Sequence, residues 1–288
     1  MGLNGARIFV TGGTGFFGYS ILSHLISLTR DCDLGISITV LSRRPGSFVV
    51  EYPEIACDPA ITWLHGDIAS FEFSDERFTH VIHAAVSYDN PASIVPNTRR
   101  MLDFAKHCGA GRFLFVSSGA VYDPVTEYAH GKLESERLCF AQDVHESVVA
   151  RCYAFVGPHM RLNGCFAVGN FMRDALSGGP IVVNGDGTSV RSYMYGSDLA
   201  AWLTAILTDG VSGHAYDVGS EEAVSMRELA GIIGEITGVD VVMQEVNDSR
   251  ASRYVPDTSK TRSELGLSVN VGLREAIRKT YEWYGRRA

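Results

Sequence analysis

A tyrosine and a lysine stand four residues apart in the stretch YDPVTEYAHGKLESER, where the sequence takes on a helical pattern. Side chains separated by four residues share one face of a helix, so Tyr128 and Lys132 could act on a single point. A phenol ordinarily titrates near pH ~10, and a neighbouring positive charge favours its phenolate. Such a pair could exchange a proton with a substrate hydroxyl or carbonyl, which is general acid–base chemistry.

A glycine-dense loop, TGGTGFFG, follows the first short apolar run (Ile8–Thr11) and precedes a helical pattern. Its glycines Gly12, Gly15 and Gly18 stand three apart, which lets a backbone turn sharply and approach a pyrophosphate at a helix N-terminus. A Walker loop is excluded because Tyr19 follows Gly18. The context predicts dinucleotide binding, and the alternative is an ordinary glycine turn.

The second apolar run, ISITVLSRRP, ends in Ser42, Arg43 and Arg44. Dinucleotide folds specific for NAD place an acid here to hold the ribose hydroxyls, and an acid would repel a 2′-phosphate. Arg43 would attract that phosphate, so NADP is favoured over NAD. Alternatively, both arginines are solvated surface charges.

Short apolar runs alternate with helical stretches through the first half of the chain, which predicts an α/β Rossmann-type fold with a doubly wound parallel sheet. The expected strands are Ile8–Thr11, Ile38–Leu41, Ile61–Leu64, His80–His83, Phe113–Val116 and Val148–Arg151, and the clearest helices are Thr98–Cys108 and Gly131–Gln142. We expect a dinucleotide-binding domain over 1–157, with a segment near 188–220 returning to it, and a smaller, discontinuous substrate lobe over 158–288.

Composition narrows the class of protein. The chain has 288 residues, 45% of them hydrophobic and 20% charged, and a formal net charge of −8. Without a Lys/Arg block it is not expected to bind nucleic acid. The six cysteines show no zinc-site spacing and are expected to be reduced core thiols. No long apolar segment opens the sequence, so we expect a cytoplasmic protein with no membrane association.

The chain resembles the extended short-chain dehydrogenase/reductase family, which includes nucleotide-sugar epimerases, dehydratases and ketoreductases. The likeness spans nearly the whole chain. Its marks are TGGTGFFG, HGDI, VIHAA, FLFVSSGAVY, YAHGK, ARCYAFVGP, VNGDGTSVRSYMYGSDLA and YDVGS, in that order.

The resemblance implies a role for each marked segment. Tyr128 would be the acid/base, Lys132 would supply positive charge and bind the nicotinamide ribose, and Ser118, which fits the family pattern SxxVY, would bond the same substrate oxygen. Tyr128 and Lys132 would also contact the cofactor. The remaining cofactor contacts would be Gly12, Thr14, Gly15, Phe16, Phe17, Gly18, Ser42, Arg43, Asp67, Ile68, Ala84 and Ala85. Asp67 could instead be a turn residue, and His83 is expected to be structural.

On the substrate side, the resemblance assigns Arg191 and Arg253 to a nucleotide diphosphate and Asn170 to the substrate. Arginine suits a phosphate because its planar fork donates two hydrogen bonds. Each residue could also be a surface residue or a cap. Together they favour a nucleoside-diphosphate sugar over a small alcohol or steroid.

The reaction depends partly on what is absent. Sugar 4,6-dehydratases of this family carry an Asp-Glu pair where this chain has Gly119 and Ala120, which disfavours dehydration. Two enzymatic readings stay open: NADPH-dependent reduction of a 4-keto-6-deoxyhexose, which we prefer, and 4-epimerisation with a tightly held cofactor. A non-catalytic cofactor-binding regulator is the alternative from another class. The resemblance also implies a homodimer.

Overall fold

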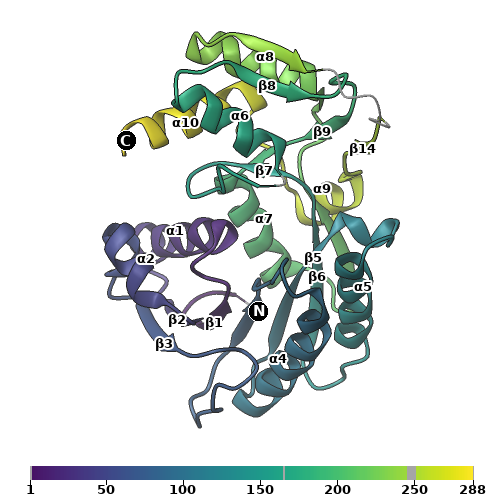
Figure 1. The fold of residues 1–288 in the computed structure, drawn as a ribbon. Coiled ribbons are helices and arrows are strands. Elements are labelled where there is room, and N and C mark those ends of the chain that lie inside the picture. The colour runs from purple at the N-terminus through teal and green to yellow at the C-terminus, as the bar shows by residue number, and fades with distance from the viewer. Residues whose placement is uncertain (1, 165, 245–250, 288) are drawn as a thin grey trace.

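The computed structural model describes residues 2–164, 166–244 and 251–287, which form a larger and a smaller lobe (Figure 1). The larger lobe is built on a seven-stranded parallel sheet with the order β11-β6-β5-β4-β1-β2-β3. Its strands are β1 (Arg7–Thr11), β2 (Ser37–Ser42), β3 (Ile61–His65), β4 (His80–His83), β5 (Arg112–Ser118), β6 (Glu146–Cys152) and β11 (Ala215–Val218). Each expected strand is confirmed, with ends that differ by two residues or fewer.

Helices cover both faces of this sheet. On one face α1 (Phe16–Cys32) packs against α7 (Gly196–Asp209), and on the other α4 (Ile94–Cys108) packs against α5 (Glu127–Phe140) (Figure 1). Strand β1 shows why: its side chains alternate, so Ile8 and Val10 enter one core while Phe9 enters the other. A sheet buried on both faces explains why its strands appear in the sequence as continuous apolar runs.

The smaller lobe has its own core, to which Met172, Ile233 and Ile277 contribute from three helices. These are α6 (Ala167–Leu176), α8 (Met226–Thr237) and α10 (Leu273–Gly285), which accompany the parallel pair β8 (Ile181–Asn184) and β13 (Val241–Gln244). A three-stranded sheet adds β9 (Val190–Ser192), β12 (Ala223–Ser225) and β14 (Arg253–Tyr254), and β7 (Phe155–Val156) pairs with β10 (Met194–Tyr195).

The chain crosses between the lobes more than once. After β9 it returns to the large sheet as α7 and β11, and after β14 it does so again as α9 (Ser259–Leu265), which packs against β11. Strand β9 itself pairs with β12 and β14 rather than with the large sheet. Of the segment near 188–220, the part from α7 onward therefore lies in the larger lobe, and β9 lies in the smaller one.

Two details complete the architecture. Cys108, Cys139 and Cys152 are buried thiols, but Cys32 and Cys57 are exposed, so the expectation of a core position is wrong for these two because they occupy the end of α1 and a surface turn. Cys165 lies outside the described residues. Among the helices of the described ranges, none combines the length and hydrophobicity needed to cross a membrane.

Candidate functional site

The catalytic candidates lie where β5 ends and α5 begins. Ser118 closes β5 and is followed by the 3-10 turn η2 (Gly119–Tyr122). The Thr126 hydroxyl caps α5 by accepting a hydrogen bond from the Ala129 amide at 3.2 Å, which fixes the start of the helix one residue before Tyr128. Helical spacing then brings Lys132 onto the same face, as predicted.

Lys132 is buried between α5 and the sheet. Its side chain is 2% exposed, Nζ donates to the Val116 carbonyl at 2.7 Å, and Nζ lies 4.6 Å from the centre of the Phe115 ring. Burial lowers the pKa of Lys132 to about 8, and interactions with Cys152, Cys139 and Glu136 offset this in part. The amine is therefore charged at neutral pH and close to its titration range.

The protein groups around Tyr128 favour its neutral phenol. Burial raises its pKa above the ordinary value, the phenol of Tyr88 raises it further, and hydrogen bonding to Ser118 lowers it. A neighbouring ammonium alone therefore does not produce a phenolate here. Tyr128 is held as a protonated phenol, the state in which it can act as an acid.

Two tyrosines that the sequence did not indicate adjoin this pair. The Tyr254 hydroxyl, on β14 of the smaller lobe, lies 3.2 Å from Ser118 Oγ. The Tyr88 ring stacks on Tyr128 with centroids 5.2 Å apart. Both contacts join residues distant in sequence, so a local motif could not have predicted them. Tyr254 brings the smaller lobe directly to the catalytic candidates.

The position after Ser118 is sterically closed. A Cβ added at Gly119 would lie 2.5 Å from the Tyr153 ring, well inside van der Waals contact. The next residue, Ala120, has a methyl side chain. Neither position can supply a carboxylate at the end of β5.

The glycine loop connects β1 to α1. Gly12 has φ +77°, and a Cβ there would lie 2.7 Å from the Ala85 amide, while a Cβ at Gly18 would lie 2.3 Å from the Gly12 carbonyl. Packing therefore requires both glycines. At Gly15 the nearest described atom would be the Gly12 carbonyl oxygen at 3.5 Å, an ordinary contact. Gly15 immediately precedes Phe16 and Phe17 in the first turn of α1, so a dinucleotide pyrophosphate fits this open helix terminus.

The ends of β2 and β3 lie beside this loop. Ser42 Oγ is 3.5 Å from Thr14 Oγ1, and Arg43 Nε is 3.9 Å from Asp67 Oδ2. The Arg43 side chain is 72% exposed. Asp67 also accepts a hydrogen bond from the Ala69 amide at 2.9 Å, so it has the turn role considered as its alternative, while Ile68 packs against the core beside β1.

The residues after β4 form the opposite wall of the loop. The amides of Ala84 and Ala85 donate to the Thr11 carbonyl and hydroxyl at 3.2 and 3.3 Å. His83 is fully buried, with Nδ1 2.8 Å from Thr11 Oγ1, and burial lowers its pKa to about 3. His83 is therefore a neutral structural histidine, as expected.

The substrate candidates belong to the smaller lobe. Arg191 on β9 donates to the Ser252 carbonyl at 3.0 Å and to its hydroxyl at 2.9 Å. It pairs in register with Tyr254, whereas Arg253 pairs with Val190. Successive side chains of a strand point to opposite faces, so Arg191 shares the face of Tyr254 and Arg253 lies on the other face. Asn170 on α6 donates to the Gly164 carbonyl at 3.0 Å, a contact consistent with its structural alternative.

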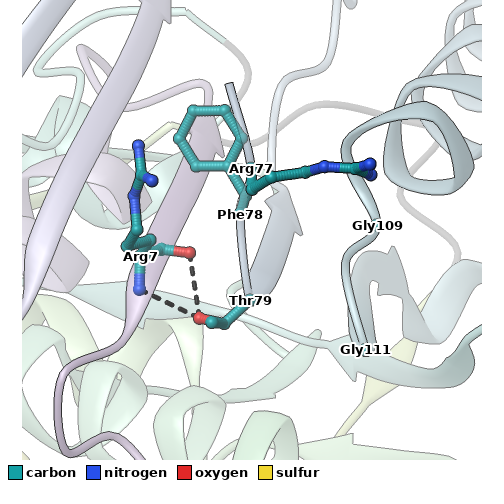
Figure 2. Close-up of a pocket in the computed structure, with 6 residues that line it drawn as sticks. All are labelled: Arg7, Arg77, Phe78, Thr79, Gly109 and Gly111. Carbon is teal, nitrogen blue, oxygen red and sulfur yellow. Dashed lines mark hydrogen bonds between the residues drawn. The ribbon is translucent and has the colours of Figure 1, made fainter. Parts of the chain in front are cut away.

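A separate depression lies at the other end of the sheet, where β1, β4 and β5 begin. It is lined by Arg7, Arg77, Phe78, Thr79, Gly109 and Gly111 (Figure 2). The Thr79 hydroxyl bonds the Arg7 amide and carbonyl at 2.9 and 3.0 Å, and Arg7 pairs with Glu76. These residues are thus engaged in joining strand ends, far along the strands from Ser118.

The chain is similar to known proteins over most of its length. The sequence model of the NAD dependent epimerase/dehydratase family matches residues 8–219. A dTDP-glucose 4,6-dehydratase of Streptomyces antibioticus is 28% identical over 96% of this chain and 92% of its own length. A UDP-glucuronic acid decarboxylase 1 of Arabidopsis thaliana is 28% identical over 94% of this chain and 68% of its own.

Solved structures show the same fold. A UDP-glucose 4-epimerase of Thermotoga maritima with UDP-glucose superposes with a TM-score of 0.85 at 23% identity, covering 98% of this chain and 99% of that one. A dTDP-glucose 4,6-dehydratase of Streptomyces venezuelae with NAD bound has a TM-score of 0.84 at 24% identity, covering 97% of both chains.

Proposed function

The chain belongs to the NAD dependent epimerase/dehydratase family, and from this premise we propose that it transfers hydride at C4 of a nucleoside-diphosphate sugar, acting as a 4-ketoreductase on an NDP-4-keto-6-deoxyhexose. The bound dinucleotide would supply the hydride. The glycine loop, Thr14, Ser42, Ala84 and Ala85 surround the helix terminus that would hold it.

The observation that favours a ketoreductase over a 4,6-dehydratase is that the Tyr153 ring leaves no space for a side chain at Gly119. Removing water across C5 and C6 requires an acid and a base in addition to the tyrosine, and Gly119 under the Tyr153 ring and Ala120 offer neither. Although curated relatives include dehydratases, hydride transfer at C4 needs only the Ser118, Tyr128 and Lys132 set.

The protonated state of Tyr128 is the one from which reduction of a ketone starts. Reduction of a ketone places a proton on O4, and a buried Tyr128 that retains its proton is prepared to give it. Ser118, which bonds Tyr128 and Tyr254, would donate to or accept from the same oxygen. The charged Lys132 would stabilise the phenolate left after the transfer.

For the cofactor we propose NADPH. The support is Arg43, an exposed guanidinium at the end of β2 beside Asp67, where an NAD-specific fold would place an acid. The solved relative from Streptomyces venezuelae holds NAD, so the preference must be measured on this chain.

The test is oxidation of NADPH or NADH at 340 nm with a nucleotide-linked 4-keto-6-deoxyhexose. We expect consumption of NADPH, reduced by about 10²–10⁴-fold in Tyr128→Phe and unaffected in Tyr281→Phe, a control on α10. Interconversion of C4 epimers without net cofactor consumption would replace the proposal by a 4-epimerase. Formation of a 4-keto-6-deoxy product from an NDP-hexose would refute it.

A further inference from the structure

A histidine outside the catalytic set contacts the glycine loop. His159 lies just after β7, with its backbone in the left-handed region at φ +63°. Its Nε2 is 3.0 Å from the Thr14 carbonyl, and its Nδ1 is 2.6 Å from the Tyr52 hydroxyl. Tyr52 joins α2 (Pro45–Glu51) to α3 (Pro53–Ala56). A non-glycine residue persists in this conformation only where its surroundings fix it.

The hydrogen bonds around His159 require a definite number of protons. The Thr14 carbonyl can only accept, so Nε2 carries a hydrogen. The Tyr52 hydroxyl lies 2.5 Å from a Glu51 carboxylate oxygen, which also only accepts, so the phenol donates there. Nδ1 must then donate to the Tyr52 oxygen. All three contacts are satisfied together only when both ring nitrogens of His159 are protonated.

The surroundings of His159 suit a cation. The ring stacks on Tyr19 with centroids 5.7 Å apart, and Tyr52 and Phe48 present further rings at 4.6 and 5.7 Å. Aromatic faces attract cations. Burial raises the pKa of Tyr19 and of Tyr52, so both stay neutral phenols.

The other charges near His159 come from the elements packed around it. They are Glu51 on α2, Glu54 on α3, and Arg287 beyond α10. Arg287 lies over the rings of Tyr52 and Trp283, and its guanidinium is 2.7 Å from Glu54. Tyr284 of α10 is a phenol bonded to the Met160 carbonyl, and burial raises its pKa.

We propose that His159, as an imidazolium, is a positioning residue that fixes the glycine loop through Thr14 and tightens dinucleotide binding at mildly acidic pH. This rests on the proposed function in one respect, that the loop receives the dinucleotide pyrophosphate. The bond to Thr14 fixes the peptide that leads into the first turn of α1, and a positive charge at this loop would attract a diphosphate held there.

The first test is direct binding of NAD and NADP to the full chain, measured by calorimetry from pH 5.5 to 8.5. For the dinucleotide that binds more tightly, we expect affinity to rise by about 3–10-fold as pH falls across this range. His159→Gln, which keeps a donor but gains no charge, should flatten that profile. Tyr52→Phe, which removes the link to Glu51, should shift the rise to lower pH. Thermal unfolding of each variant establishes that it is folded.

A second readout needs no cofactor. Long-range proton–nitrogen NMR spectra of the protein alone should show, at pH 6, one imidazole with both nitrogens protonated that is absent from His159→Gln. A neutral His159 at pH 6, or a wild-type pH profile that matches that of His159→Gln, would overturn the inference while leaving dinucleotide binding intact. Failure of the chain to bind any dinucleotide would overturn both proposals.

Discussion

Burial of the charged Lys132 lowers the free energy of unfolding, and the pH dependence of stability measures by how much. The pKa of Lys132 is lowered from 10.5 to about 8, so the unfolded chain binds the proton more strongly than the folded one. Below pH 8 both states are charged and the folded state carries the penalty of burial. The free energy of unfolding therefore rises between about pH 8 and 10.5, because the folded chain loses this proton at a lower pH than the unfolded chain.

Lys132→Met should consequently stabilise the protein while abolishing activity. We expect a gain of about 2–3 kcal/mol in the free energy of unfolding at pH 7, shrinking towards pH 10. Urea unfolding at several pH values measures it, with the exposed Lys106→Met on α4 as control. Equal stability of wild type and Lys132→Met at pH 7 would show that the buried charge is compensated by neighbours.

At the scale of one element, α5 is tied to the sheet through a buried ion pair. Glu136 is 1% exposed, accepts from Arg151 of β6 at 2.7 Å and from the Ser117 hydroxyl of β5 at 2.6 Å. Glu136→Gln removes the buried charge that pairs with Arg151, so we expect a loss of about 3 kcal/mol.

Glu134→Gln, on the exposed side of the same helix, is the matched control. It weakens a surface pair with Arg137 at 3.3 Å and should cost about 0.5 kcal/mol or less. Denaturant unfolding of the two variants compares them directly. Similar losses would mean that α5 is held by its apolar contacts alone.

The glycine loop offers a second prediction at this scale. Gly18→Ala places a methyl group 2.3 Å from the Gly12 carbonyl and should destabilise α1 against its loop. Gly15→Ala meets that carbonyl at 3.5 Å, at a backbone φ of −98° that any residue adopts, and should leave thermal stability nearly unchanged. Yet Gly15→Ala should weaken dinucleotide binding about tenfold or more, because its methyl group lies where the pyrophosphate approaches. A calorimetric titration that finds full affinity in Gly15→Ala would place the diphosphate elsewhere.

The strands of the large sheet could be predicted from the sequence, whereas the contacts between the lobes could not. Strands such as β4 and β5 were predictable because a sheet buried on both faces produces continuous apolar runs. The approach of Tyr254 to Ser118 was not predictable, since it depends on the two-residue strand β14, whose pairing with β9 is decided by tertiary packing. For the same reason the family resemblance could assign Arg191 and Arg253 to one diphosphate but could not show that they lie on opposite faces.

For the whole molecule, the proposed function assigns the cofactor to the larger lobe and the substrate to the smaller one. The face of β9 and β14 on which each arginine lies then predicts which arginine contacts the substrate. Arg191 shares the face of Tyr254, which reaches Ser118, so Arg191→Ala should weaken binding of a nucleoside diphosphate by about 10–100-fold, the range expected for charge-assisted hydrogen bonds. Arg253→Ala, on the opposite face, should change it by about threefold or less. Dinucleotide affinity, which belongs to the larger lobe, should be unaltered in both. Calorimetric titration of each variant with UDP and dTDP, and separately with the dinucleotide, measures all three quantities. A larger effect of Arg253→Ala than of Arg191→Ala would mean that the nucleoside diphosphate binds on the other face of β14, away from Tyr254 and Ser118.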